Sequence, residues 1–185
     1  MKHADGYLEF RHSKARGSSR LYQQSWTPDG DIRAGILLVH GLGAHSTRYP
    51  PVAEQLTGRG FAVHTLDHYG HGKSDGQPGF VERFSVFLDG VTALMRKVQS
   101  KNPEQPVFLV GHSRGGLIAA ALLLEHQAAF RACVLSGPAI KSDQAPPAIV
   151  IALIRLIAVL APTAPLIQLD ASGVSRDQDV VIAYM

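Results

Sequence analysis

Short apolar runs recur along the chain, and each has the length and composition of a β-strand. They are rich in Val, Ile, Leu or aromatic residues, and each ends near glycine, proline or another turn-forming residue. The predicted strands are residues 6–10, 21–26, 36–39, 61–67, 107–110 and 132–136. Stretches between them have helical character and predict helices at residues 49–59, 85–100 and 117–125. Strands that alternate with helices in this way indicate an α/β fold, with a mostly parallel sheet covered by helices on both faces.

The strand predicted at residues 107–110 runs into Gly111-His112-Ser113-Arg114-Gly115, and a helix-forming stretch follows. G-x-S-x-G between a buried strand and a helix is typical of a nucleophile elbow, a sharp turn that presents a serine above the sheet. The backbone at such a turn is strained, so the positions two residues before and after the serine need glycine. We therefore expect Ser113 close to the N-terminus of the helix, where free backbone N–H groups can stabilise an oxyanion. A glycine-rich turn with an incidental serine is the alternative interpretation.

Hydrophobic residues make up 45% of the chain and charged residues 18%, which is ordinary for a globular domain and excludes a disordered protein. The net charge of +3 comes from scattered lysines and arginines without a basic stripe between aromatics, so we expect no nucleic-acid partner. The one cysteine, Cys133, lies in an apolar run, where we expect it to be buried, and it has no intramolecular disulfide partner. Because no apolar signal segment is visible near residue 1, we expect a cytoplasmic protein, or one peripheral at a membrane.

Residues 148–160 are apolar throughout except for Arg155, and Pro162 and Pro165 follow them. A helix of this length would be about 20 Å long, which is too short for the hydrocarbon core of a bilayer. One interpretation is a helix over the top of the sheet that turns an apolar face to a lipid substrate or a membrane interface. A plain buried helix is the other, and the sequence leaves both open.

Further motifs carry a family resemblance. They are H-G-x-G-x-H-S-x-R-Y at residues 40–49, D-H-x-G-H-G-x-S at residues 67–74 and G-x-S-x-G-G at residues 111–116. In this order they resemble the monoacylglycerol lipase group of the α/β-hydrolases, which is also lysophospholipase-like. The resemblance runs from about Gly6 to the last residue. It implies an α/β-hydrolase fold whose core occupies residues 1–137 and whose cap, or lid, occupies residues 138–185.

The resemblance also implies roles for particular residues. Ser113 would be the acyl-accepting nucleophile, and the backbone N–H groups of Leu42 and Arg114 would form the oxyanion hole. The residues that would shape the oxyanion loop and support the elbow are His40, Gly41, Gly43, Gly111, His112 and Gly115. The family usually has an apolar residue in place of Arg114, whose cation would favour a substrate with negative charge.

These roles imply a serine esterase that cleaves monoacylglycerols or other single-chain lipid esters through an acyl-enzyme, without a cofactor. Its small-molecule partner would be a lipid ester, and its cap would be the part that contacts a membrane interface. His64, Asp67, His68 and His71 raise a metal site as an alternative. A strand followed by a glycine-rich loop gives no regular face for metal ligands, so we expect no metal.

A nucleophilic serine needs a base and an acid, which in this fold follow it in the order Ser, Asp or Glu, His. The only histidine after Ser113 is His126, which lies roughly 15 Å or more away along the predicted helix. We therefore expect a chain truncated after the sixth strand and the cap, without the triad Asp and His, and impaired as an enzyme. A base from an upstream histidine or a partner chain is one alternative, and a non-catalytic ligand-binding or interaction protein is another. The strand at 132–136 would be an exposed sheet edge, through which we expect self-association.

Overall fold

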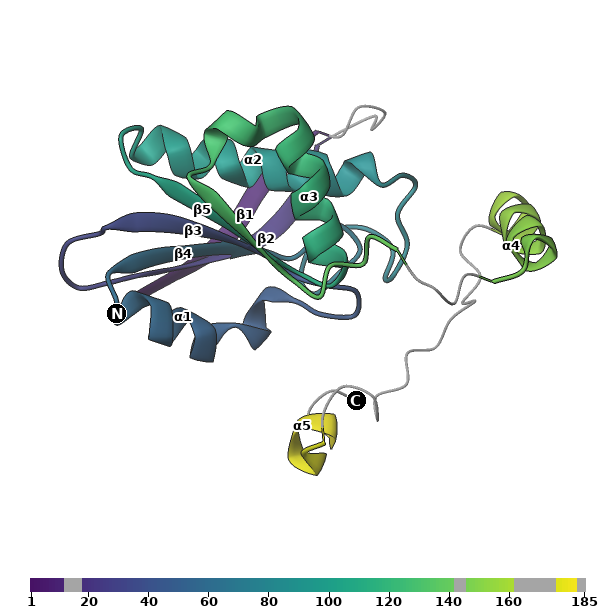
Figure 1. Cartoon of the computed structure of the whole chain (residues 1–185), viewed down its shortest axis with the longest axis horizontal. Helices are drawn as coiled ribbons and strands as arrows, with labels where there is room; N and C mark the ends of the chain where they lie inside the picture. The colour runs from purple at the N-terminus through teal and green to yellow at the C-terminus, as the bar shows by residue number, and fades with distance from the viewer. Residues whose placement is uncertain (12–17, 142–145, 162–175, 183–185) are drawn as a thin grey trace. The chain divides into compact units, whose positions relative to one another are not determined.

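The computed structural model describes residues 1–11, 18–141, 146–161 and 176–182 (Figure 1). The chain divides into one compact unit, Met1–Ser142, and a second, Asp143–Met185, and each is described by itself. The predicted boundary between an α/β-hydrolase core at residues 1–137 and a cap at residues 138–185 stays a prediction.

A six-stranded sheet runs through the first unit. Its strands are β1 (Lys2–Phe10), β2 (Ser19–Thr27), β3 (Ala34–Val39), β4 (Phe61–Leu66), β5 (Val107–His112) and β6 (Ala132–Ser136). Their order across the sheet is β1-β2-β4-β3-β5-β6. β1 and β2 pair antiparallel with their neighbours, whereas β4 with β3, β3 with β5 and β5 with β6 pair in parallel. The predicted mostly parallel sheet is confirmed.

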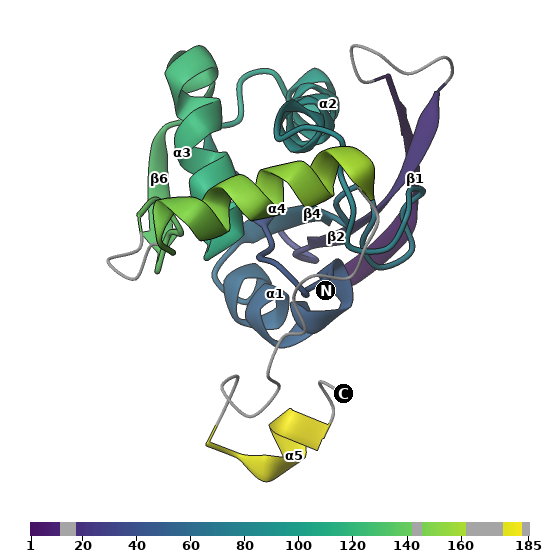
Figure 2. The same ribbon diagram turned by 90° about the vertical axis from the view of Figure 1, so that its right-hand side faces the viewer.

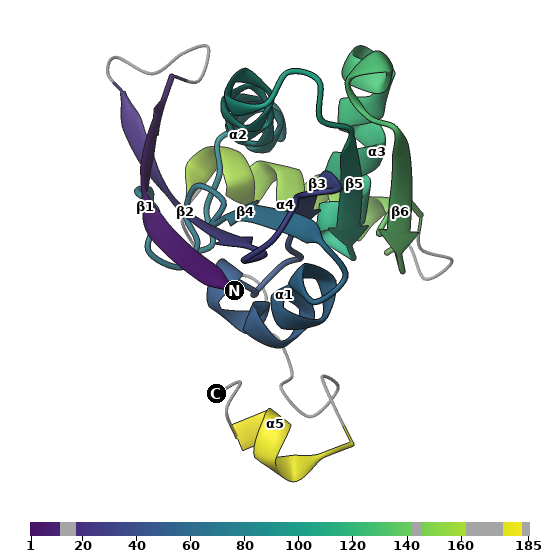
Figure 3. The same ribbon diagram turned by 90° about the vertical axis from the view of Figure 1, so that its left-hand side faces the viewer.

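Helices cover both faces of this sheet, as Figures 2 and 3 show. α1 (Pro50–Thr57) lies on one face, and α2 (Ser85–Lys101) and α3 (Arg114–His126) lie on the other. Leu37 and Leu38 are consecutive in β3, so their side chains point to opposite faces. Leu37 packs in the larger core with α2 and α3, and Leu38 packs in a smaller core with α1. The sheet is therefore buried from both sides, as its continuous apolar strands predicted.

The second unit contains α4 (Ala148–Leu160) and α5 (Gln178–Ile182). α4 coincides with the apolar stretch predicted as a helix, and Arg155 is the charged residue within it. None of the described helices combines the length and the apolar character that crossing a membrane requires. The first unit also has two short 3-10 helices, η1 (Ser46–Arg48) and η2 (Gln127–Ala129).

Among the described strands, β1 and β6 form the two edges of the sheet. β6 is exposed along most of its length, and Val134 has 59% of its surface open to solvent. The expectation that Cys133 is buried was wrong, because this β6 residue is half-buried: it touches the larger core but lies on the edge strand. An exposed apolar edge is a site where chains associate. Self-association through β6 stays a prediction.

Candidate active site

Ser113 lies at the turn between β5 and α3, where the sequence predicts a nucleophile elbow. Its backbone has φ 54° and ψ −121°, and no other described residue except glycines has a positive φ. Such a conformation costs a residue with a side chain roughly 1–3 kcal/mol, and it persists only where surrounding contacts enforce it. The side chain of Ser113 is partly exposed. The backbone therefore has the geometry expected of an elbow.

Glycines on either side of Ser113 allow three backbone segments to meet. A Cβ atom at Gly111 would overlap the carbonyl group of Gly115 at the start of α3. A Cβ atom at Gly115 would lie 2.6 Å from the carbonyl oxygen of His40 and would overlap that of Val39, at the end of β3. The spacing of the two glycines thus follows from the close approach of β5, α3 and β3.

The end of β6 and the segment after it hold the elbow from another side. The N–H of Ser113 donates to the carbonyl of Ser136 at 2.9 Å, and the carbonyl of Ser113 accepts the N–H of Ala139 at 3.0 Å. His112 is exposed, and its Nδ1 lies 3.2 Å from the hydroxyl oxygen of Ser136. The strained backbone is therefore fixed at both its N–H and its carbonyl group.

The loop that follows β3 passes beside Ser113. A Cβ atom at Gly41 would lie 3.2 Å from Cβ and 3.7 Å from Oγ of Ser113, so this loop is in contact distance of the hydroxyl. Gly43 has φ 65°, in the left-handed region that glycine favours. Leu42 lies between the two glycines with 46% of its surface exposed. The structure therefore brings the predicted oxyanion loop next to the predicted nucleophile.

His40 is fully buried and fixes this loop with both ring nitrogens. Its Nδ1–H donates to the carbonyl of Gly41 at 2.8 Å, and its Nε2 accepts the N–H of His68 at 3.0 Å. The Nε2–H of His68 donates in turn to the carbonyl of His40 at 3.2 Å. Burial lowers the pKa of His40 to about 3 and the pKa of His68 well below its ordinary range, so both imidazoles are neutral at pH 7.

Asp67 organises the loop that follows β4. Its Oδ1 accepts the N–H of Ser46 at 2.6 Å, and its Oδ2 accepts the N–H of Lys73 at 2.9 Å. The hydroxyl of Ser74 donates to the Asp67 carbonyl at 2.6 Å. A Cβ atom at Gly72 would overlap the carboxylate, so glycine is required there. Both carboxylate oxygens accept hydrogen bonds from backbone N–H groups. Asp67 therefore has a structural role in this loop.

Arg114 is the first residue of α3, so its backbone N–H has no acceptor within the helix. Its guanidinium lies over the Phe87 ring of α2, with Cζ 4.6 Å from the ring centroid, and Nη2 donates to Nε2 of His71 at 2.9 Å. The Nδ1–H of His71 donates to the carbonyl of Tyr69 at 3.1 Å. Burial lowers the pKa of Arg114 to about 10, which leaves it charged at pH 7. The cation packs against α2, and its predicted effect on anionic substrates stays a prediction.

The histidines near the elbow lie close to one another. The ring centroid of His40 is 4.2 Å from that of His68 and 5.7 Å from that of His71. Their hydrogen bonds to backbone and to Arg114 account for the proximity. Within the ranges that the structure describes, no group of three or more His, Cys, Asp or Glu side chains could hold a metal ion.

Known proteins are similar to this chain in sequence and in fold. A family described as "Serine aminopeptidase, S33" matches residues 30–185. A monoacylglycerol lipase of Mycolicibacterium smegmatis is 36% identical over 168 residues, which cover 91% of this chain and 60% of that protein. The chain belongs to this family and, within it, is similar to the monoacylglycerol lipase and lysophospholipase-like α/β-hydrolases.

Two further proteins are similar to this monoacylglycerol lipase-like chain. The monoglyceride lipase of Homo sapiens is 32% identical over 179 residues, which cover 96% of this chain and 59% of that protein. The crystal structure of a monoacylglycerol lipase of Paleococcus ferrophilus has a TM-score of 0.75 and 31% identity, covering 89% of this chain and 61% of that one. The chain thus spans about three fifths of the length of the curated relatives it matches.

Three histidines that could serve as a base are either distant from Ser113 or already engaged in hydrogen bonds. His126 is the last residue of α3, so the helix separates it from Ser113 by about 20 Å at 1.5 Å per residue. His40 and His71 each use both ring nitrogens in hydrogen bonds. The alternative in which an upstream histidine takes the Ser113 proton therefore finds no support from these residues.

Sequence reasoning missed the side-chain roles that hold the loops together. It gave no hydrogen-bond partners for Asp67 or His71. A signal was available for Asp67, since a carboxylate followed by a glycine-punctuated loop is typical of a side chain that binds backbone N–H groups. No such local signal exists for the contact between Arg114 and His71, because the two residues are 43 positions apart.

Proposed function

We propose that Ser113 is the nucleophile of a serine hydrolase that cleaves monoacylglycerols or other single-chain lipid esters. The observation that carries the proposal is the strained Ser113 backbone, with φ 54°, beside the Gly41 loop. In α/β-hydrolases this strained turn presents the nucleophile to the substrate. The substrate class is supported by relatives named monoacylglycerol lipase and monoglyceride lipase.

In the proposed reaction Ser113 Oγ attacks the ester carbonyl carbon while a base takes the hydroxyl proton. The carbonyl oxygen becomes an oxyanion that accepts hydrogen bonds from the backbone N–H groups of Leu42 and Arg114. The bond to the glycerol oxygen then breaks, glycerol leaves with the proton, and the acyl group stays on Ser113. Water hydrolyses this acyl-enzyme, releases the fatty acid and regenerates the serine.

The base that this reaction needs is proposed to lie outside the described residues. His40 and His71 are committed to hydrogen bonds, and His126 lies at the other end of α3. A chain of these 185 residues is therefore expected to turn over esters at only a residual rate. The region 138–185 is proposed to be a cap that meets the lipid interface, and the apolar sequence of α4 favours this.

Labelling with a fluorophosphonate probe tests the assignment of Ser113. After incubation of the chain with excess probe, peptide mass spectrometry locates the label. We expect the label on Ser113 alone, none on S113A, and parent-like labelling of S136A, which removes a neighbouring hydroxyl but keeps the backbone carbonyl that fixes Ser113. Label spread over other serines, or absent after prolonged incubation at pH 9, would contradict the assignment.

The pH dependence of labelling tests the proposal about the base. Without an imidazole, the Ser113 hydroxyl loses its proton to hydroxide, so the labelling rate should rise about tenfold per pH unit between pH 6 and pH 9. A histidine base would instead give a plateau above about pH 7, since an ordinary histidine has a pKa near 6.5. That plateau, if lost on S113A, would show that the chain carries its own base.

A ligand-binding or interaction protein of the same fold is the second candidate. The engaged ring nitrogens of His40 and His71 favour it. In that case the hydroxyl of Ser113 does not act as a nucleophile. The folded chain would then stay unlabelled at pH 9 but would bind a non-hydrolysable ether analogue of a monoacylglycerol, and S113A would bind it equally well.

A further inference from the structure

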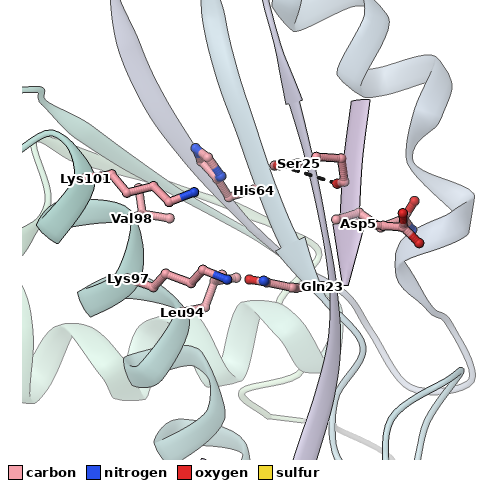
Figure 4. Close-up of a pocket in the computed structure, with 10 residues that line it drawn as sticks. Asp5, Gln23, Ser25, His64, Leu94, Lys97, Val98 and Lys101 are labelled. Atoms are coloured by element: carbon pink, nitrogen blue, oxygen red, sulfur yellow. Dashed lines mark hydrogen bonds between the residues drawn. The ribbon is translucent and has the colours of Figure 1, made fainter. Parts of the chain in front are cut away.

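A cavity of about 190 Å³ lies between the C-terminal half of α2 and the strands β1, β2 and β4 (Figure 4). It belongs wholly to the first unit, and none of the residues assigned to the Ser113 site lines it. The lining side chains that matter here are Gln23, His64, Leu94, Lys97, Val98 and Lys101. The cavity is therefore distinct from the Ser113 site, and its lining carries lysine, histidine and glutamine side chains.

Two lysines reach into this cavity from one face of α2, as Figure 4 shows. Lys97 and Lys101 are four residues apart, a spacing at which like charges destabilise a helix. Neither ammonium group pairs with a carboxylate of the described chain. Burial, and then the charge of Lys101, lowers the pKa of Lys97. These cations repel each other, and an anion between them would offset the repulsion.

Hydrogen-bond donors from the sheet face the two lysines. His64 comes from the middle of β4, where it pairs with Ser25 of β2. Burial first, and then the charges of Lys101 and Lys97, lower the pKa of His64 to about 4, so it is a neutral imidazole with one N–H donor at pH 7. The Gln23 side chain ends near Lys97 in Figure 4 and carries two amide N–H donors.

The only carboxylate among the lining residues, Asp5, points away from the lysines. It accepts the Tyr22 hydroxyl at 2.6 Å. Tyr22 precedes Gln23 in β2, so the two side chains lie on opposite faces of the sheet. Figure 4 accordingly shows Asp5 on the far side of the strands. An anion in the cavity would meet cationic and neutral donors and no opposing carboxylate from this lining.

We propose that this cavity binds the phosphate group of a phosphate-bearing molecule. The terminal oxygens of a phosphate point in different directions and can accept hydrogen bonds from Lys97, Lys101 and His64 together with the Gln23 amide, whereas the two oxygens of a carboxylate lie in one plane. Hydrogen bonds between ammonium groups and phosphate are also among the strong ones in proteins. The proposal does not depend on the chemistry at Ser113.

Calorimetric titration of the chain with inorganic phosphate, at constant ionic strength in chloride, tests the proposal. We expect saturable binding that weakens by roughly 100-fold in K97Q/K101Q, at about tenfold for each charged hydrogen bond lost. The matched control is R96Q/K141Q, which removes the same charge from exposed positions outside the cavity. The control should keep the affinity of the parent chain.

Thermal unfolding of the same variants separates a lost site from a misfolded chain. Without phosphate, K97Q/K101Q should unfold at a slightly higher temperature than the parent, because a like-charge pair is gone. With saturating phosphate the parent should be the more stable of the two, because ligand binding stabilises the folded state. No saturable binding by the parent, an equal loss in both double variants, or the absence of this reversal would overturn the proposal.

Two further ligands distinguish the source of the phosphate group. Glycerol 3-phosphate carries it on a small soluble molecule, and vesicles of phosphatidylcholine with phosphatidic acid carry it as a lipid headgroup. If the parent and R96Q/K141Q bind one of these ligands and K97Q/K101Q does not, the result supports the phosphate site. The ligand that binds identifies the source of the phosphate group. If the parent bound neither, the cavity would not be a site for phosphate-bearing molecules.

Discussion

At the scale of single residues, Ser113 occupies a backbone conformation that glycine would adopt with less strain. Its backbone dihedral angles, φ 54° and ψ −121°, lie in a region that residues with a side chain rarely adopt. The Gly111, Gly115 and Ser136 contacts hold it there. A serine in this strained backbone conformation lowers the stability of the fold. Such strain is expected where the side chain takes part in a reaction.

A comparison of glycine with alanine at this position measures the strain. At an exposed helix position such as Ser100, glycine is less stable than alanine by about 1 kcal/mol. At Ser113 we expect the opposite order, with S113G more stable than S113A by about 1 kcal/mol, because only glycine relieves the positive φ. Urea unfolding of S113G, S113A, S100G and S100A gives both differences. If S113A were at least as stable as S113G, the backbone would not be strained.

Local sequence was enough to place Ser113 but not its buried neighbours. The apolar strand, the glycine spacing and the following helix formers all lie within a few residues of Ser113, so the elbow could be predicted. The function of His40 depends on the N–H of His68, which is 28 residues further along the chain. Partners at such distances depend on how the strands pack, and a single sequence does not reveal them.

At the scale of elements, the site depends on how closely α3 approaches β3. The sequence predicted this helix to begin at residue 117, where a run rich in Ala and Leu starts. In the structure α3 begins at Arg114. Gly115 allows the first turn to contact the carbonyl groups at the end of β3, and a Cβ atom at Gly116 would lie 2.8 Å from Cβ of Pro138. Packing therefore outweighs helix propensity in this turn.

Alanine at Gly115 tests this approach. In an unobstructed helix the change would stabilise the chain by up to about 1 kcal/mol. Here the added Cβ meets the carbonyl groups of Val39 and His40, so we expect G115A to lower the free energy of unfolding by about 2–4 kcal/mol. The control is G30A, because an added Cβ at Gly30 meets nothing within 4 Å. A G115A chain as stable as G30A in urea would mean that α3 and β3 are not in close contact.

The strands were predicted better than their order. Each apolar run recurs as a strand whose bounds lie within four residues of the predicted ones, because burial leaves a local signal in the sequence. That β4 lies between β2 and β3 could not be read from the residues, since pairing joins segments that are distant in the chain. The family resemblance implied the fold, and the position of β4 in the sheet came from the structure.

At the scale of the whole molecule, the first unit keeps three histidines in their neutral form. His40 and His68 are buried, and His64 is a half-buried residue that lines the cavity beside α2. Burial is the largest cause of the lowered pKa of each. At mildly acidic pH these imidazoles stay neutral in the folded chain but bind a proton in the unfolded chain. The free energy of unfolding therefore depends on pH.

This coupling predicts that acid destabilises the chain. Below about pH 6.5 the unfolded chain binds protons at His40, His64 and His68 while the folded chain does not, so the free energy of unfolding falls as the pH is lowered. Each histidine contributes about 1.4 kcal/mol per pH unit. The window ends near the folded pKa, at about 4 for His64 and about 3 for His40. Urea unfolding at pH 7, 6 and 5 should show the loss, whereas constant or rising stability would contradict it.

The arrangement around Ser113 is the central claim, and the structure of a covalent adduct tests it most directly. A crystal structure of the chain with a phosphonate bonded to Ser113 Oγ would show where the phosphoryl oxygen, which mimics the oxyanion, lies. We predict this oxygen at about 2.7–3.1 Å from the backbone nitrogens of both Leu42 and Arg114. A phosphoryl oxygen directed to solvent, or a Leu42 N–H that points away from it, would contradict the account.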